Sequence, residues 1–171
     1  MVARSATPAL AALLACAAAV PADAAGKGRS IAKSKLLWAT VNVCDTVDKP
    51  NVIGIRASMP GSGIRSERMY VRFQVQFRAA ADRKWHNVGK AGDSGFIAIG
   101  SARYRARQAG RNFTIKPPSD GGAYRLRGAV TYEWRIDGKV VRRVRKRTLK
   151  RRGATRGADP KGYSAGSCVI R

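Results

Sequence analysis

The chain has 171 residues, a length that suits one domain. Lys and Arg together number 34 against 10 Asp and Glu, so the formal net charge is +24. Such a charge favours anionic partners and speeds encounter with them, but it does not choose among nucleic acid, anionic lipid and anionic wall polymer.

The N-terminus has the features of a secretory signal peptide. A short positive start, Met1–Arg4, precedes the apolar run Ala9–Val20, and Ala22-Asp23-Ala24 fits a small-residue cleavage site. We therefore expect cleavage after Ala24 or Ala25. The alternative is a lipoprotein signal at Leu13-Leu14-Ala15-Cys16, in which Cys16 carries the lipid.

Cys44 and Cys168 remain once Cys16 is set aside. An even pair of cysteines in an exported chain normally forms a disulfide, so we expect this bond. It would tie the first strand to the C-terminus.

Short segments of alternating polarity, separated by Gly- and Pro-containing turns, predict strands along most of the chain. The clearest is Met69–Ala79, in which odd-numbered residues from Met69 to Phe77 face the core. The other predicted strands cover residues 36–44, 51–59, 85–88, 96–99 and 111–115. Residues 103–110 are expected to form either a loop or an edge strand protected by arginines.

A predicted hairpin, Tyr124–Thr148, is the centre of the expected core. Tyr132 and Trp134 lie on its apolar face, and Asp137-Gly138 turns the chain back. A two-residue turn would place Val140 and Val144 on the charged face. We expect instead a three-residue loop with a bulge at Gly138, because that register brings both valines to the core face.

Together these elements predict an all-β fold: a single antiparallel, immunoglobulin-like β-sandwich of about seven or eight strands, with a small β-barrel as the alternative. The expected organisation is a signal peptide (residues 1–24), a flexible basic leader (25–35), the sandwich (36–149) and a basic tail (150–171) tied back by Cys168.

Two resemblances follow from these segments. The region from Cys44 to Thr148, with Tyr124 placed like a tyrosine corner, resembles immunoglobulin-like and fibronectin type III-like domains, although its cysteines lie at the two ends. More narrowly, Val41–Asp45, Met69–Phe77 and Tyr124–Arg143 are similar to segments of uncharacterised secreted bacterial proteins of high arginine content. This resemblance implies export and a fold; it carries no catalytic residues.

Catalytic and metal-binding patterns are weak. Gly92-Asp93-Ser94-Gly95 matches the nucleophile motif of chymotrypsin-like proteases, but His86, the only histidine, is eight residues before Ser94 rather than on a separate barrel. A metal site needs several ligands, and there is no second histidine or spare cysteine. We therefore expect no enzyme activity, no metal and no cofactor, and keep a hydrolase as a minor alternative.

The strongest candidate for a binding surface is a basic cluster. Nine of the fifteen residues from Arg142 to Arg156 are Lys or Arg. The predicted polyanion-binding residues are Arg142, Arg143, Arg145, Lys146, Arg147, Lys150, Arg151 and Arg152. A second group comprises Arg103, Arg105, Arg107 and Arg111. Guanidinium groups bind phosphate and carboxylate well, but charged side chains also protect a strand edge from pairing with another copy.

The sequence thus predicts a secreted, non-catalytic binding or structural module at the cell envelope, in contact with anionic polymers through arginines. The alternative is an extracellular nucleic-acid-binding protein. Neither the ligand nor the oligomeric state follows from the sequence.

Overall fold

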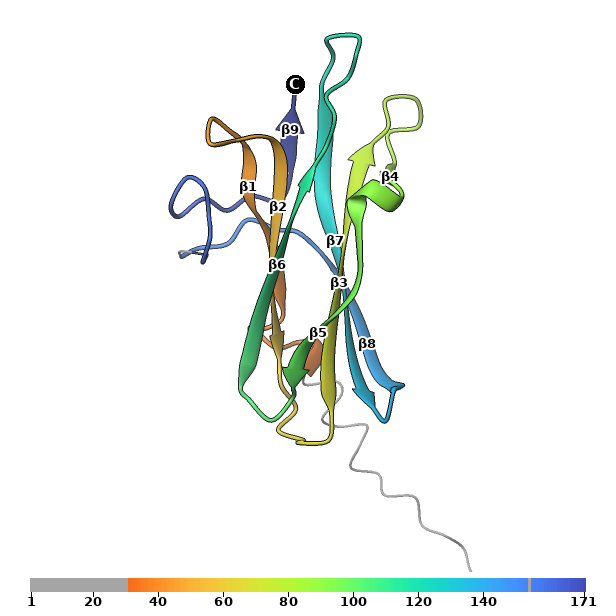
Figure 1. Cartoon of the computed structure of the whole chain (residues 1–171), viewed down its shortest axis with the longest axis vertical. Coiled ribbons are helices and arrows are strands. Elements are labelled where there is room, and N and C mark those ends of the chain that lie inside the picture. Colours follow the sequence, from red (N-terminus) through yellow and green to blue (C-terminus); the bar gives the residue numbers. More distant parts are fainter. Residues whose placement is uncertain (1–30, 154) are drawn as a thin grey trace, which may run out of the picture.

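The computed structural model describes residues 31–153 and 155–171. The predicted signal peptide, its cleavage site and Cys16 lie outside these residues. The described chain forms nine β-strands in two antiparallel sheets that pack as a sandwich (Figure 1). The all-β sandwich is therefore confirmed.

The smaller sheet, sheet A, has the order β1-β2-β6. Its strands are β1 (Trp38–Thr46), β2 (Lys49–Pro60) and β6 (Ala106–Thr114). The larger sheet, sheet B, has the order β4-β3-β7-β8, with β5 paired to β3 and β9 paired to β7. Its strands are β3 (Arg68–Arg78), β4 (Trp85–Asn87), β5 (Asp93–Ser101), β7 (Tyr124–Ile136), β8 (Lys139–Arg147) and β9 (Cys168–Ile170).

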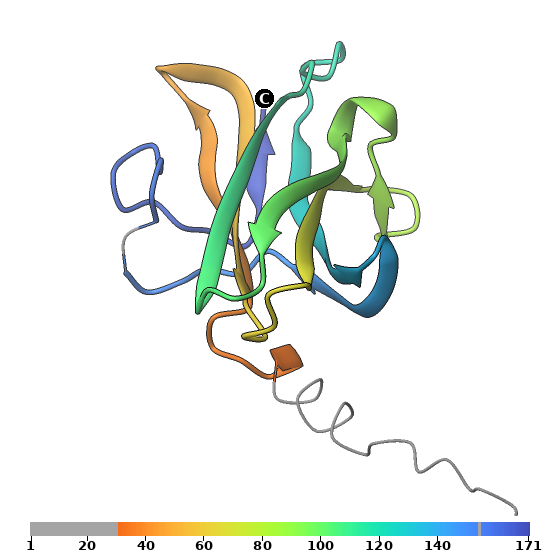
Figure 2. The same cartoon turned by 60° about the horizontal axis from the view of Figure 1, so that its bottom comes forward.

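Two of the differences from the expected strands concern β6 and β9. Residues 106–114 form one edge strand, β6, which joins the uncertain segment to the short strand predicted after it. The short strand β9 was not predicted, because its three residues pair only with the start of β7. β5 and β6 follow one another in different sheets and connect the two layers along one side (Figure 2).

The core lies between the sheets and follows the predicted alternation. Met69, Val71, Phe73 and Val75 on β3 are at most 1% exposed. On β7 the hydroxyl of Tyr132 donates a hydrogen bond to the Trp38 carbonyl at 2.7 Å. This bond links the two sheets and satisfies a polar group that is otherwise buried. Burial also raises the pKa of the Tyr132 hydroxyl.

The hairpin turn differs from the expectation. Ile136 pairs with Lys139, so the loop has two residues, and both of them, Asp137 and Gly138, have positive φ. The bulge lies further along, at Val141, because Arg135 pairs with Val140 but Trp134 pairs with Arg142. The predicted bulge at Gly138 is therefore wrong.

The displaced bulge separates the two valines. Val144 pairs with Tyr132 and packs against the core, as predicted. Val140 pairs with Arg135 on the outer face and is 42% exposed, contrary to the prediction. Directly opposed residues of an antiparallel pair share a face, so one extra residue between the valines sends them to opposite sides.

The C-terminal segment covers the free edge of β1. The backbone N–H of Leu149 donates to the Ala39 carbonyl at 2.9 Å, and Val41 and Ala165 exchange two backbone hydrogen bonds. Thr40 and Asn42, on the outer face of β1, are therefore buried beneath this segment. Covering an edge strand in this way protects it from pairing with another chain.

Cys44 on β1 and Cys168 on β9 form the predicted disulfide, with their Cα atoms 5.4 Å apart. The bond joins the two sheets at the end where the C-terminus lies (Figure 1). Among the described residues, no helix has the length and apolar character needed to cross a membrane.

Candidate anion-binding groove

The fold distributes the predicted basic cluster over several places. Arg142 and Arg143 are adjacent in sequence but lie on opposite faces of β8, opposite Trp134 and Glu133. Arg142 Nη1 donates to Glu67 Oε1 at 3.3 Å, and Arg143 Nε donates to Glu133 Oε1 at 2.6 Å. Both arginines therefore have carboxylate partners within the protein, which lowers the charge they offer to a ligand.

Arg145 and Arg147 lie on the outer face of sheet B, opposite Thr131 and Ala129. Neither forms an ion pair with a carboxylate among the described residues. Burial lowers the pKa of the neighbouring Arg127, and the charges of Arg147 and Arg145 lower it further. Lys146 alternates to the other side of β8, opposite Val130, and is half-buried.

The remaining cluster residues follow β8. Lys150 and Arg152 are exposed. The Arg151 guanidinium lies 3.9 Å from the ring centre of Trp38, so this side chain packs on sheet A. The predicted cluster is thus divided among an outer face, two ion pairs and an aromatic contact, and it does not form a single patch.

A denser group of arginines lies along β6 and the loops at its start. Three adjoining hollows share lining residues: the first and second share Arg107, and the second and third share Arg56 and Arg156. Their volumes are about 370, 460 and 360 Å³. We call them together the arginine groove; its arginines are Arg56, Arg65, Arg68, Arg103, Arg107, Arg111 and Arg156.

No Asp or Glu lines any of the three hollows, and none of these arginines forms an ion pair within the described part of the chain. The other polar residues of the lining include the amides Asn42, Gln108 and Asn112. Arg107 and Arg111 share a face of β6, since they lie opposite Met59 and Ile55, and they line the second and third hollows respectively. The groove is therefore a cationic and amide-lined surface without internal counter-charge.

Arg56 and Arg156 form the middle of the groove. Arg56 projects from β2, and burial lowers its pKa, with a further lowering by the positive charge of Arg156. Arg156 is brought there by the C-terminal segment, which Asn42 holds by donating from Nδ2 to the Gly157 carbonyl at 2.8 Å. Two neighbouring guanidinium groups without a carboxylate repel one another, and a bound anion would relieve that repulsion.

Tyr104 lies at the first hollow, between β5 and β6. The guanidinium carbons of Arg103 and Arg107 are each 4.5 Å from the centre of its ring. A hydrogen bond from Arg103 and the nearby positive charges lower the pKa of the Tyr104 hydroxyl. The ring therefore orders two cations at the groove instead of leaving a free face for a base.

The protease-like motif does not assemble catalytic chemistry. His86 Nε2 lies 2.7 Å from Asp82 Oδ2, whereas Asp93 accepts from Arg72 Nε at 2.8 Å. The Ser94 hydroxyl accepts from the Phe73 N–H at 2.9 Å and donates to the Gly95 carbonyl. Each member of the motif is thus engaged with a different local partner. Within residues 31–153 and 155–171, no three His, Cys, Asp or Glu side chains gather as metal ligands.

Sequence reasoning found part of the groove. Arg103, Arg107 and Arg111 belong to the second basic group, but the sequence does not link Arg56 and Arg156 to them. Arg56 and Arg156 are 100 residues apart and meet only through the fold. The available signal was the outward position of Arg56 on its strand. Comparison with protein-family models and with curated proteins gives no match for this chain.

Proposed function

We propose that the protein is a non-catalytic anion-binding module that holds anionic polymers of the cell envelope in the arginine groove. The observation that carries the proposal is a run of three adjoining hollows lined by seven arginines and by no carboxylate. Guanidinium groups bind phosphate and carboxylate oxygens in a bidentate manner, which suits a polymer with repeated anionic groups.

The groove supports this role better than the outer face of sheet B does. On that outer face Glu133 pairs with Arg135 and Arg143, and Asp93 pairs with Arg72. These carboxylates reduce the local positive potential. In the groove the positive charges stay uncompensated, so an external anion gains more from binding there.

The aromatic side chains favour an anionic polymer over a nucleic acid read through its bases. Binders of single strands stack bases on open aromatic faces. Here arginines cover two half-buried rings of sheet B: Arg127 lies 4.2 Å from the ring centre of Trp85, and Arg135 lies 4.2 Å from that of Tyr70. Binding is thus proposed to depend on charge spacing and not on base identity.

Export is the second part of the proposal. The Cys44–Cys168 disulfide is typical of proteins that fold in oxidising compartments outside the cytosol. Together with the predicted signal peptide it supports a secreted or envelope-bound location. Fractionation of native cells into cytosol, envelope and medium across a salt series tests this. Protein retained in the cytosol would contradict export, and protein that stays in the medium at low salt would contradict binding to the envelope.

The groove is tested by removing its central charge. We expect the triple variant Arg56→Gln, Arg107→Gln, Arg156→Gln to bind linear polyphosphate at least tenfold more weakly at low salt. With single-stranded oligo-dT as a second phosphate polymer, the slope of log affinity against log salt should fall by roughly 2, at about 0.7 per lost phosphate contact.

The matched control is Arg125→Gln, Arg145→Gln, Arg147→Gln, which removes the same charge from the outer face of sheet B, where Arg125 is exposed on β7 opposite Val169. It should retain most of the affinity. Equal losses in the two triples would show that only net charge matters and would contradict the groove. Binding of oligo-dT that is much tighter than polyphosphate of equal phosphate number would favour the nucleic-acid alternative.

A further inference from the structure

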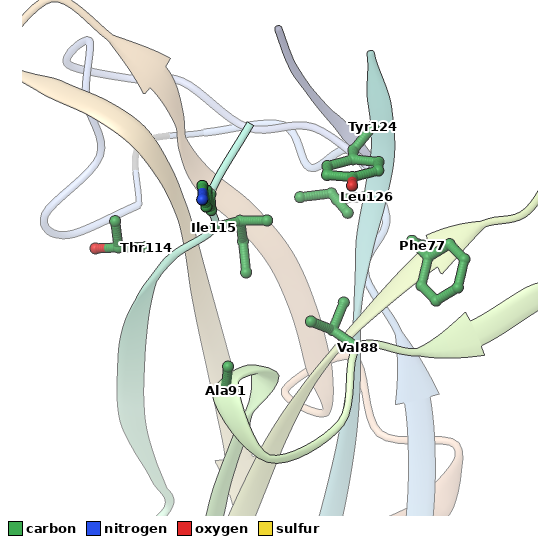
Figure 3. A pocket seen from close by; sticks show the side chains of 8 residues that line it. Phe77, Val88, Ala91, Thr114, Ile115, Tyr124 and Leu126 are labelled. Carbon is green, nitrogen blue, oxygen red and sulfur yellow. The ribbon is translucent and has the colours of Figure 1, made fainter. Parts of the chain in front are cut away.

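A second candidate site, separate from the arginine groove, is apolar instead of cationic. It is a pocket of about 330 Å³ at one end of the sandwich. Its lining comes from β3, η1 (Lys90–Gly92), the ends of β6 and β7, and the segment after β4. The lining residues are Phe77, Val88, Ala91, Thr114, Ile115, Lys116, Tyr124 and Leu126. Figure 3 shows Phe77, Val88, Ile115 and Leu126 arranged around the open space.

The pocket reaches the core of the protein. Leu126 is 1% exposed and Ile115 is 7% exposed, so its deepest walls are buried apolar side chains from the two layers. Tyr124 is 38% exposed, and its ring lies beside Leu126 at the opening (Figure 3). The volume falls at the lower end of the range of about 300–1,000 Å³ found for small-molecule sites.

The walls are held in place by backbone contacts. The N–H of Ile115 donates to the Asn51 carbonyl at 2.9 Å, and the N–H of Val88 donates to the Val75 carbonyl at 3.0 Å. At Gly92 an added Cβ would lie 2.9 Å from the Val88 Cβ, so η1 packs closely against this wall. The pocket is therefore preformed and does not need a loop to move before a ligand enters.

The only charged residue of the lining is Lys116. It forms no ion pair with any carboxylate in the described part of the chain. The acidic group of the adjoining loop, Asp120, is used locally, where its Oδ1 accepts the Gly122 N–H at 3.0 Å. An apolar cavity with one uncompensated cation at its lining complements a ligand with an apolar body and a single anionic head.

We propose that this pocket binds a small anionic amphiphile, with the acyl or other apolar part between Phe77, Val88, Ile115 and Leu126 and the acidic head beside Lys116. The site does not depend on the arginine groove. It differs from the groove in requiring apolar burial, which salt does not weaken as it weakens contacts between exposed charges.

Titration of the isotope-labelled protein with decanoate, followed by methyl NMR, tests the pocket. We expect saturable shifts centred on the methyl groups of Val88, Ile115 and Leu126. Ala91→Trp, at an exposed position of η1, should fill the opening and abolish these shifts while the melting temperature stays near that of the wild type. Absent or non-saturable shifts below the micelle concentration would overturn the proposal.

The role of Lys116 is tested by comparing decanoate with decanol. Lys116→Glu should weaken decanoate binding by about five-fold, the size of an exposed ion pair, and leave decanol binding unchanged. Lys139→Glu, which makes the same charge change at the β7–β8 turn, should alter neither. Equal affinities of the wild type for decanoate and decanol would contradict the proposal that the ligand has an anionic head beside Lys116.

The groove triple variant separates the two sites. It should bind decanoate as the wild type does, since none of its three arginines lines the pocket. Loss of decanoate binding in that variant would overturn the assignment of the ligand to this pocket. Loss of polyphosphate binding by the triple variant, with decanoate binding intact, supports both sites independently.

Discussion

At the scale of single residues, two buried carboxylates organise part of the positive charge. Glu67 and Glu133 are 1% and 0% exposed, although the alternation predicted Glu133 on a solvent-facing side. Glu133 Oε2 accepts from Arg135 Nε at 2.8 Å, while its other oxygen accepts from Arg143. Long arginine side chains cover the carboxylate, so burial here comes from its partners and not from the core.

Glu133→Gln should lower the free energy of unfolding by about 3 kcal/mol, because removal of one partner leaves a network of charged hydrogen bonds incomplete. Urea denaturation at neutral pH measures the loss. Asp137→Asn, which removes an exposed carboxylate from the turn, is the control and should change stability little. Equal effects of the two substitutions would contradict the special role of Glu133.

Asp93 should contribute to the acid dependence of stability. Its hydrogen bond from Arg72 holds its pKa below the usual range, against the opposing effect of burial. A carboxyl whose pKa is lower in the folded state stabilises the protein above the unfolded-state pKa of about 4, and the contribution is lost as pH falls through the folded pKa.

We therefore expect Asp93→Asn to flatten the fall in melting temperature between pH 4 and pH 2, with a lower starting value at neutral pH. Arg72→Gln should flatten the same region, since it removes the group that lowers the pKa. Acid melting profiles that match the wild type in both variants would contradict the pairing.

At the scale of elements, the β7–β8 hairpin shows that the alternation of polar and apolar residues does not fix the turn or the register of the paired strands. The sequence is compatible with a two-residue turn and with a bulge, and the protein contains both, but at different places. A two-residue turn with positive φ at Asp137 and Gly138 matches the twist of the strands. The bulge at Val141 then restores Val144 to the core side, which local sequence does not locate because Val140, Val141 and Val144 are all apolar.

Gly138→Ala should destabilise the protein by about 1–2 kcal/mol, because φ at this position is 77° and a Cβ is disfavoured there. Asp137→Asn is tolerated, since Asn adopts the left-handed region readily. The midpoint of urea denaturation measures the loss of stability, and NOE contacts between Tyr132 and Val144 report the register of β7 and β8. An unchanged midpoint for Gly138→Ala would show that the turn has another conformation.

At the scale of the whole molecule, the C-terminal segment turns an open sandwich into a closed unit. It covers the edge of β1, delivers Arg156 to the arginine groove and ends in β9, which the disulfide joins to β1. Structure and proposed function therefore depend on the same segment. The loop enclosed by the disulfide is long, because the two cysteines are separated by 124 positions in the sequence.

Reduction of the disulfide, or Cys44→Ala with Cys168→Ala, should lower the free energy of unfolding by roughly 4 kcal/mol, because the open chain gains entropy when it unfolds. In a denaturing thiol assay, the chain from residue 25 onward should show no free thiol before reduction and two after it. The single variant Cys44→Ala, with one free thiol, calibrates the assay. Two free thiols without reductant would contradict the bond.

The sequence by itself determined most of the strands, the core face of the clearest ones and the cysteine pair, because alternation of polar and apolar residues and the cysteine count can be recognised without the fold. It did not determine β9 or the face of Val140. It also predicted a cationic surface. Only the tertiary structure decided which cations remain free: Arg142 and Arg143 gain carboxylate partners, whereas Arg56 and Arg156 meet without one. The attraction between an arginine and a carboxylate weakens as the distance between them grows. Strand pairing and the returning C-terminal segment set these distances, and no local sequence pattern specifies either.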